Sequence, residues 1–200
     1  MQSKDWFENW YSGKEKIFAW NIGKPHRGII ETFDDMKLKK GRVLVPGCGT
    51  GYDAFFLAER GFDVIAFDFS TNVIKKARSK LKSKDKIKGN LKFEVEDIYH
   101  LPDSYNNKFD YVVEIANFQA MSVKERRDYV RVIADVLKPR GKCVVLCKKY
   151  PPLTPGPKGI KKSSLKKYFS TAFVIEDIKP VLMYRKSDPA DGFRLIAKKK

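Results

Sequence analysis

The chain has 200 residues, of which 42% are hydrophobic and 13% aromatic, a composition typical of one globular domain with a sizeable core. No apolar run approaches the roughly 18 residues of a membrane span, and no apolar stretch follows a basic start, so we expect neither a membrane protein nor a secretory leader. The formal net charge of +17 leaves open a partner that carries phosphate groups.

The first 40 residues precede the regular part of the pattern. They contain Trp6, Trp10 and Trp20, and they end in an amphipathic run over residues 27–38. Apolar residues at helical spacing in that run predict a helix. The three tryptophans either pin this segment to the core or offer aromatic faces to a cation.

After Gly41, short apolar runs alternate with segments of helical periodicity. The predicted strands cover residues 42–45, 63–67, 91–95, 109–115 and 142–147, and the predicted helices cover 52–60, 71–81 and 123–137. Ser70 and Ser122 directly precede two of these helices, where an N-cap residue belongs. Strands that alternate with helices predict βαβ units and a parallel sheet.

The last fifty residues complete the predicted fold. Four prolines and two glycines within residues 151–159 indicate a surface loop, residues 163–169 a short helix, and residues 173–185 and 192–200 an antiparallel hairpin. We therefore expect an α/β fold, with a Rossmann-like, seven-stranded, mostly parallel sheet, helices on both faces and an antiparallel C-terminal strand. It forms a single domain over residues 1–200, with a helical N-terminal segment at 1–40 and the core at 41–200.

A glycine-rich turn follows the first predicted strand. Gly47, Gly49 and Gly51 have the spacing G-x-G-x-G, at the point where a strand leads into a helix N-terminus. Glycine admits positive φ and close approach of a ligand, and the helix N-terminus favours an anionic group. The dinucleotide fingerprint has its third glycine one position later, where this chain has Tyr52. The spacing therefore favours S-adenosylmethionine, which has a carboxylate and no pyrophosphate, over NAD.

Two acidic residues follow the next two strands. Asp68 ends the second predicted strand, 21 residues after Gly47, where an acid can accept both ribose hydroxyls. Asp97 follows the third strand and can accept the adenine amino group, while its neighbour Ile98 packs on the base. Each feature alone is also compatible with a tight turn, a strand-end cap or a solvated acid. Together, in this order, they predict a nucleoside site.

These residues resemble the class I S-adenosylmethionine-dependent methyltransferases, and more narrowly the thiopurine and thiol methyltransferase family. The sequence VPGCG at 45–49 has Val45 where most of that class carries an acid. WFENWYSGK at 6–14 matches the family's W-x-x-x-W-x-x-G-K opening, and AWNIGKPH at 19–26 resembles its P-W-D-x-G-x-P segment, with Ala19 and Asn21 as departures. TPGPKGIKKSSLKKYF at 154–169 resembles its substrate loop and the helix after it.

The resemblance implies a helical lid at residues 1–40 and a set of residues that contact the cofactor. The set comprises Trp6, Trp10, Trp20, Gly47, Gly49, Asp68, Phe69, Asp97, Ile98 and Ile115. Ile115 stands where some relatives have Arg, so this chain lacks that cation for the cofactor's carboxylate. The implied reaction transfers a methyl group in line from S-adenosylmethionine to a small molecule, most simply a thiol or thiopurine sulfur, with S-adenosylhomocysteine as product and no metal. A halide or a metalloid is an alternative candidate for the methyl acceptor.

The residues on the acceptor side are less sharply indicated. The candidates are Ile17, Phe18, His26, Asn117, Phe118 and Tyr150. Phe118 is better suited to core packing than to acceptor contact. A thiol acceptor does not require a dedicated base, because its thiolate fraction can react; if there is one, His26 is a better candidate than His100. The residues after the fourth strand, NFQAM, lack the Asn/Asp-Pro-Pro-aromatic and Pro-Cys patterns of enzymes that methylate amino groups or cytosine C5.

The charge and the cysteines bound the remaining alternatives. Residues 75–88 hold eight Lys or Arg and the single acid Asp85, which suits either a solvated helix face or a nucleic-acid contact. An RNA or protein methyltransferase and a non-catalytic S-adenosylmethionine-binding module are therefore the alternatives. Nucleic acid is not the favoured partner. The three cysteines form neither a zinc pattern nor a disulfide framework, so we expect a cytoplasmic protein, as a monomer or weak homodimer.

Overall fold

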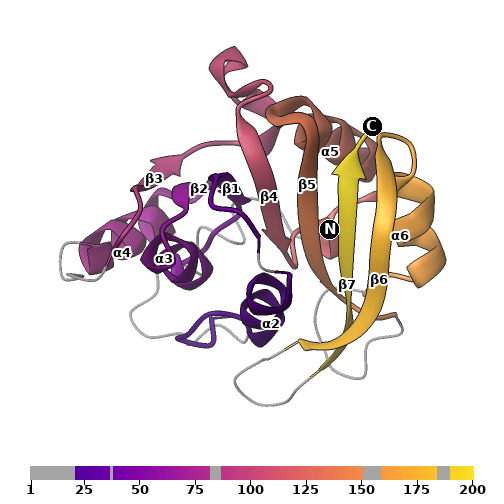
Figure 1. Cartoon of the computed structure of the whole chain (residues 1–200), viewed down its shortest axis with the longest axis horizontal. Coiled ribbons are helices and arrows are strands. Elements are labelled where there is room, and N and C mark those ends of the chain that lie inside the picture. The colour runs from indigo at the N-terminus through magenta and orange to yellow at the C-terminus, as the bar shows by residue number, and fades with distance from the viewer. Residues whose placement is uncertain (1–20, 37, 82–86, 151–158, 184–189) are drawn as a thin grey trace.

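The computed structural model describes residues 21–36, 38–81, 87–150, 159–183 and 190–200. They form one seven-stranded sheet in the order β3-β2-β1-β4-β5-β7-β6, with helices on both faces (Figure 1). This is the predicted Rossmann-like α/β fold. The predicted division into a lid and a core stays a prediction, since residues 1–20 lie outside the described part.

The central strands are parallel and, apart from β5, close to their predicted bounds. They are β1 (Arg42–Pro46), β2 (Asp63–Asp68), β3 (Leu91–Val95), β4 (Phe109–Ile115) and β5 (Leu137–Lys148). β1 pairs in parallel with both β2 and β4, and its neighbours continue the pattern on either side. All five strands therefore end at one edge of the sheet, where ligands of open parallel sheets bind.

Two antiparallel strands close the sheet. β6 (Phe173–Met183) and β7 (Ala190–Lys199) form the predicted hairpin, and β7 lies between β5 and β6, antiparallel to both. β5 begins five residues earlier than predicted, because Leu137 pairs with Phe109 before the register shifts and Lys142 pairs with Tyr111. The apolar run of residues 142–147 marks only the part of that strand beyond the exposed residues 138–140.

The helices form two layers, one on each face of the sheet (Figure 1). The bounds are α2 Arg27–Asp35, α3 Tyr52–Glu59, α4 Thr71–Leu81, α5 Val123–Val136 and α6 Lys162–Phe169. Alternate residues of β1 face the two layers: Val43 and Val45 pack with α2, α3 and α4, and Leu44 packs with α5 and α6. A sheet buried on both faces needs consecutive apolar residues, as the stretches at 43–46 of β1 and 64–67 of β2 have.

Local capping explains where two helices begin. The Ser70 hydroxyl accepts a hydrogen bond from the Val73 N–H at 3.2 Å and starts α4. Ser122 and Glu125 form a capping box at the start of α5. Both predicted N-caps are confirmed. In the described part of the chain, no helix is long and apolar enough to cross a membrane.

Candidate active site

The glycine turn joins the end of β1 to the start of α3. Gly47, Gly49 and Gly51 all have positive φ, at +57°, +54° and +85°. The Cys48 N–H donates to the Phe67 carbonyl at 2.9 Å, so the turn is tied to the end of β2. The left-handed conformations explain why three glycines stand here, since other residues pay roughly 1–2 kcal/mol for each.

The three glycines differ in what surrounds them. A Cβ at Gly47 would lie 2.3 Å from Asn117 Oδ1, and one at Gly51 would lie 2.6 Å from the Phe93 ring. A Cβ at Gly49 would meet no atom of the described residues within 4 Å. Gly47 and Gly51 are therefore required for packing, whereas Gly49 faces open space in which a ligand can approach the backbone.

Asp68 holds the turn from the end of β2. Its side chain is buried, and its two carboxylate oxygens accept hydrogen bonds from the Gly49 N–H at 3.1 Å and the Ser70 N–H at 3.0 Å. This carboxylate therefore contacts the glycine turn directly. Phe69, the next residue, is half-buried.

Asp97 and Ile98 lie beside Asp68 at the end of the neighbouring strand. Asp68 pairs with Val95 in the sheet, and the Glu96 N–H donates to the Asp68 carbonyl at 3.2 Å. Asp97 accepts from the Tyr99 N–H at 3.2 Å and faces His100 Nδ1 at 3.0 Å. The structure thus brings the turn and the two predicted acids together at one edge, and the residues fit a ligand with an anionic tail, a ribose and a base.

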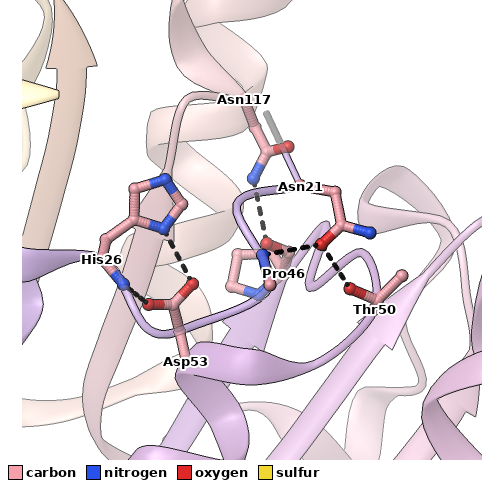
Figure 2. Close-up of polar contacts among 7 residues, drawn as sticks. Asn21, His26, Pro46, Thr50, Asp53 and Asn117 are labelled. Carbon is pink, nitrogen blue, oxygen red and sulfur yellow. Dashed lines mark hydrogen bonds and ion pairs between the residues drawn. The ribbon is translucent and has the colours of Figure 1, made fainter. Parts of the chain in front are cut away.

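The residues after β4 form the opposite wall of the turn. Ala116 has a φ of +65°, and Asn117 Nδ2 donates to the Pro46 carbonyl at 2.9 Å (Figure 2). Asn117 therefore contacts the glycine turn directly. Ile115 is half-buried and packs against the core next to this turn.

Glu114 supports that wall from inside the protein. One carboxylate oxygen, Oε1, accepts hydrogen bonds from the Asn117 N–H at 2.5 Å and the Phe118 N–H at 2.9 Å. The other oxygen has no hydrogen-bond partner among the described residues. Burial raises the pKa of Glu114 from 4.5 to about 7, although the two N–H groups act in the opposite direction. Sequence reasoning missed this residue, and an acid inside the apolar run FDYVVEI was the available signal.

The segment from Asn21 to His26 lies against the same turn (Figure 2). Asn21 Oδ1 accepts a hydrogen bond from the Thr50 hydroxyl at 3.1 Å. The His26 N–H donates to Asp53 Oδ1 at 2.7 Å, and His26 Nδ1 lies 3.1 Å from Asp53 Oδ2. Asp53 was not predicted, although an acid in the first turn of the helix after the glycines was a visible signal.

The remaining predicted residues fall in different places. Phe118 is fully buried against Tyr129, Tyr168 and Phe169, so its ring packs in the core rather than at the edge of the site. Tyr150 is exposed, with Lys161 Nζ 5.5 Å from its ring centroid. The predictions for Trp6, Trp10, Ile17, Phe18 and Trp20 lie outside the described residues, as does most of the loop at 151–159.

The cysteines supply no reactive thiolate. Burial raises the pKa of the Cys48, Cys143 and Cys147 thiols well above the usual range. All three cysteines are free thiols. Within the described ranges no three His, Cys, Asp or Glu side chains are grouped to hold a metal ion.

The chain is similar in sequence to known methyltransferases. The model of the thiopurine S-methyltransferase family matches residues 1–193. The 2-heptyl-1-hydroxyquinolin-4(1H)-one methyltransferase of Mycobacteroides abscessus is 28% identical over 193 residues, which cover 92% of this chain and 83% of that protein. The probable thiol methyltransferase 2 of Arabidopsis thaliana is 29% identical over 144 residues, which cover 72% of this chain and 61% of the plant protein.

Solved structures show the same fold. A chain from the structure titled "Conversion of a Disulfide Bond into a Thioacetal Group during Echinomycin Biosynthesis" superposes with a TM-score of 0.87 at 23% identity. The match covers 99% of this chain and 93% of that one. The arrangement of the sheet, including its C-terminal hairpin, is therefore shared with a protein of quite different sequence.

Proposed function

The chain belongs to the thiopurine S-methyltransferase family and is an S-adenosylmethionine-dependent methyltransferase; from this premise we propose that its acceptor is a small molecule with a nucleophilic sulfur, a thiol or a thiopurine. The observation that carries the proposal is the family match over residues 1–193. The name of the plant relative, a probable thiol methyltransferase, supports the same acceptor class.

The described residues suggest how each part of S-adenosylmethionine is held. We assign the amino-acid tail to the open side of the turn at Gly49, where no Cβ obstructs the backbone. The ribose hydroxyls face Asp68, and the adenine lies between Asp97 and Ile98, with Phe69 and Ile115 at the margins of the site. When bound, the cofactor supplies a methyl group activated by a sulfonium charge. The protein's part is to orient the two reactants and to exclude water.

The position assigned to the cofactor also indicates where the methyl acceptor binds. Asn117 and His26 lie at the glycine turn from two different segments, one after β4 and one before α2. We place the acceptor between these segments, with Tyr150 nearer its outer edge. The proposed site is completed by residues of the predicted lid, namely the three tryptophans and either Ile17 or Phe18. Two properties stay predictions from the sequence. These are a cytoplasmic location and assembly as a monomer or weak homodimer.

Release of S-adenosylhomocysteine against a panel of acceptors tests the proposal. The panel should contain alkanethiols, arylthiols, thiopurines, iodide, thiocyanate and a hydroxyquinolone. We expect product with the sulfur acceptors. Product with the hydroxyquinolone alone, or with iodide alone, would replace sulfur by oxygen or halide as the acceptor atom. A cofactor-binding measurement by calorimetry on the same preparation confirms that an inactive sample is folded.

A further inference from the structure

The His26 side chain is held by a carboxylate rather than by its own helix. His26 occupies the N-cap position of α2 but makes no side-chain capping bond there. Instead, both its backbone N–H and its Nδ1 contact the Asp53 carboxylate, at 2.7 and 3.1 Å (Figure 2). Two contacts to one carboxylate fix the position of the histidine as well as the rotation of its ring.

This arrangement sets which ring nitrogen carries the proton. An ionised carboxylate only accepts hydrogen bonds, so Asp53 favours the tautomer of His26 with hydrogen on Nδ1. The lone pair is then on Nε2, which has no hydrogen-bond partner among the residues that the structure describes. Each of the two side chains is only 14% exposed, so the pair is largely shielded from water but still accessible.

The pair stands at the proposed methyl-transfer site. Asp53 lies in the first turn of α3, two residues after Gly51, and the segment that carries His26 also contacts Thr50 through Asn21. A carboxylate, a histidine oriented by it and an Nε2 that no described residue engages are the components of a general base.

We propose that His26, oriented by Asp53, is the general base that takes the proton of a neutral thiol acceptor. The inference rests on the proposed function and narrows it, because it selects an acceptor with an S–H group over a halide or another anion that has no proton to lose. As the acceptor sulfur forms its bond to the methyl carbon, its S–H proton passes to Nε2. The bond from that carbon to the sulfonium sulfur breaks, and its electron pair stays on that sulfur, which becomes a neutral thioether. The imidazolium that results is stabilised by Asp53 and returns its proton to water.

Two thiols of different acidity test the base. A simple alkanethiol is a weaker acid than the cysteine thiol, whose pKa is about 8.5, and is therefore almost entirely protonated at pH 7, whereas 4-nitrothiophenol is mostly thiolate. In His26→Gln we expect kcat/KM for the alkanethiol to fall by about 10²- to 10⁴-fold, the usual contribution of a general base. For 4-nitrothiophenol we expect a change below about threefold on the same reasoning. Asp53→Asn should give the same pattern with a smaller loss.

A matched control separates this effect from a loss of surface charge. Asp34 is an exposed acid that pairs with Arg60 at 3.2 Å, and Asp34→Asn should leave both thiols unaffected. An equal loss for both thiols in His26→Gln would mean that the pair only supports the fold or the cofactor, and no loss for either would mean that no base is needed. Both results overturn the proposal. If the wild-type protein methylates neither thiol but does methylate another acceptor, the proposed sulfur acceptor itself is wrong.

A second measurement needs no turnover. The chain has two histidines, so nitrogen-15 NMR of the ring nitrogens resolves His26 from His100. We expect His26 to carry its hydrogen on Nδ1 in the wild type, and to lose this preference in Asp53→Asn. Hydrogen on Nε2 of the neutral ring in the wild type would overturn the assignment of the base.

Discussion

At the level of single residues, the carboxylate of Asp68 has two roles, one in the structure of the turn and one in the proposed binding of the cofactor. It accepts hydrogen bonds from the N–H groups of Gly49 and Ser70, and it lies where we place the cofactor ribose. Charged hydrogen bonds of this kind are individually stronger than neutral ones. The residue is therefore expected to affect both the shape of the turn and the affinity for the cofactor.

Asp68→Ala should weaken S-adenosylmethionine binding by about 1–3 kcal/mol, because the charged hydrogen bonds are lost. Calorimetry measures the affinity. Asp63 lies at the other end of β2 and pairs with Arg42 at 3.6 Å on the surface, so Asp63→Ala is the matched control and should leave the affinity unchanged. Unchanged affinity in Asp68→Ala would show that the ribose binds elsewhere.

Glu114 is the second residue with a measurable consequence, since its folded-state pKa of about 7 lies above the ordinary value of 4.5. Between these two pH values the folded protein keeps a proton that the unfolded chain has lost. The free energy of unfolding therefore falls as pH rises from 4.5 to about 7, by about 3 kcal/mol from this group, and is then constant.

Glu114→Gln should abolish this decline, because an amide does not titrate. Urea unfolding of both proteins at pH 4.5, 6 and 7.5 gives the difference in unfolding free energy, in which the other titrating groups cancel. We expect the variant to gain about 3 kcal/mol relative to the wild type across this range. A difference that is independent of pH would mean that Glu114 titrates alike in the folded and unfolded states.

At the level of elements, the glycine turn and the turn after β4 behave as one unit. Asn117 donates to Pro46, and its side chain fills the space beside Gly47 that a Cβ would need. Gly49 has the same left-handed backbone but open space in place of a neighbour. Substitutions two residues apart in one turn should therefore have different effects.

Gly47→Ala should destabilise the fold, and Gly49→Ala should mainly weaken cofactor binding. Both variants carry a backbone cost of roughly 1–2 kcal/mol. Gly47→Ala adds a clash with Asn117 worth about 1–3 kcal/mol, whereas the methyl of Gly49→Ala enters the space that we assign to the cofactor tail. Chemical unfolding and calorimetry on the same samples separate the two effects. Equal loss of stability with equal loss of affinity would contradict this division of roles.

At the level of the whole molecule, the charge of +17 raises the question of a nucleic-acid partner. Part of the basic helix α4 is already engaged within the fold. Arg78 donates twice to the Phe93 carbonyl, at 3.0 and 2.6 Å, and Lys80 donates to the Thr50 carbonyl at 3.2 Å. These two cations join α4 to β3 and to the glycine turn, so they do not serve only as a solvated surface.

We therefore expect RNA to bind only as it does to any basic surface. The dissociation constant should be micromolar or weaker, about 10⁻⁴–10⁻⁶ M at physiological salt, with a steep dependence on salt concentration. Fluorescence anisotropy of a labelled RNA at several salt concentrations measures both quantities. A nanomolar dissociation constant at about 150 mM salt would be far tighter than this non-specific range, and it would favour an RNA acceptor over a small molecule.

Much of the fold could be predicted from short stretches of the chain. β3, β4 and α4 have their predicted bounds, because period-two or period-3.6 patterns and the Ser70 cap mark them locally. The three glycines, Asp68 and Asp97 also converge at one edge, since parallel strands in sequence order bring their ends together. The length of β5 was underestimated because the polar, exposed residues 138–140 separate Leu137, which pairs with Phe109, from the apolar run of the strand.

Other features depend on segments that are far apart in the chain. The contact of Asn117 with Pro46 and the burial of Glu114 follow from which strands lie side by side, and the pairing of His26 with Asp53 follows from how α2 and α3 pack on the sheet. Hydrophobic periodicity and turn chemistry act over a few residues, so they indicate elements and a cofactor turn. These local patterns give no information about the distance between a residue before α2 and a carboxylate on α3. That distance arises only when both helices pack on the same face of the sheet, and it is there that the site acquires its oriented histidine.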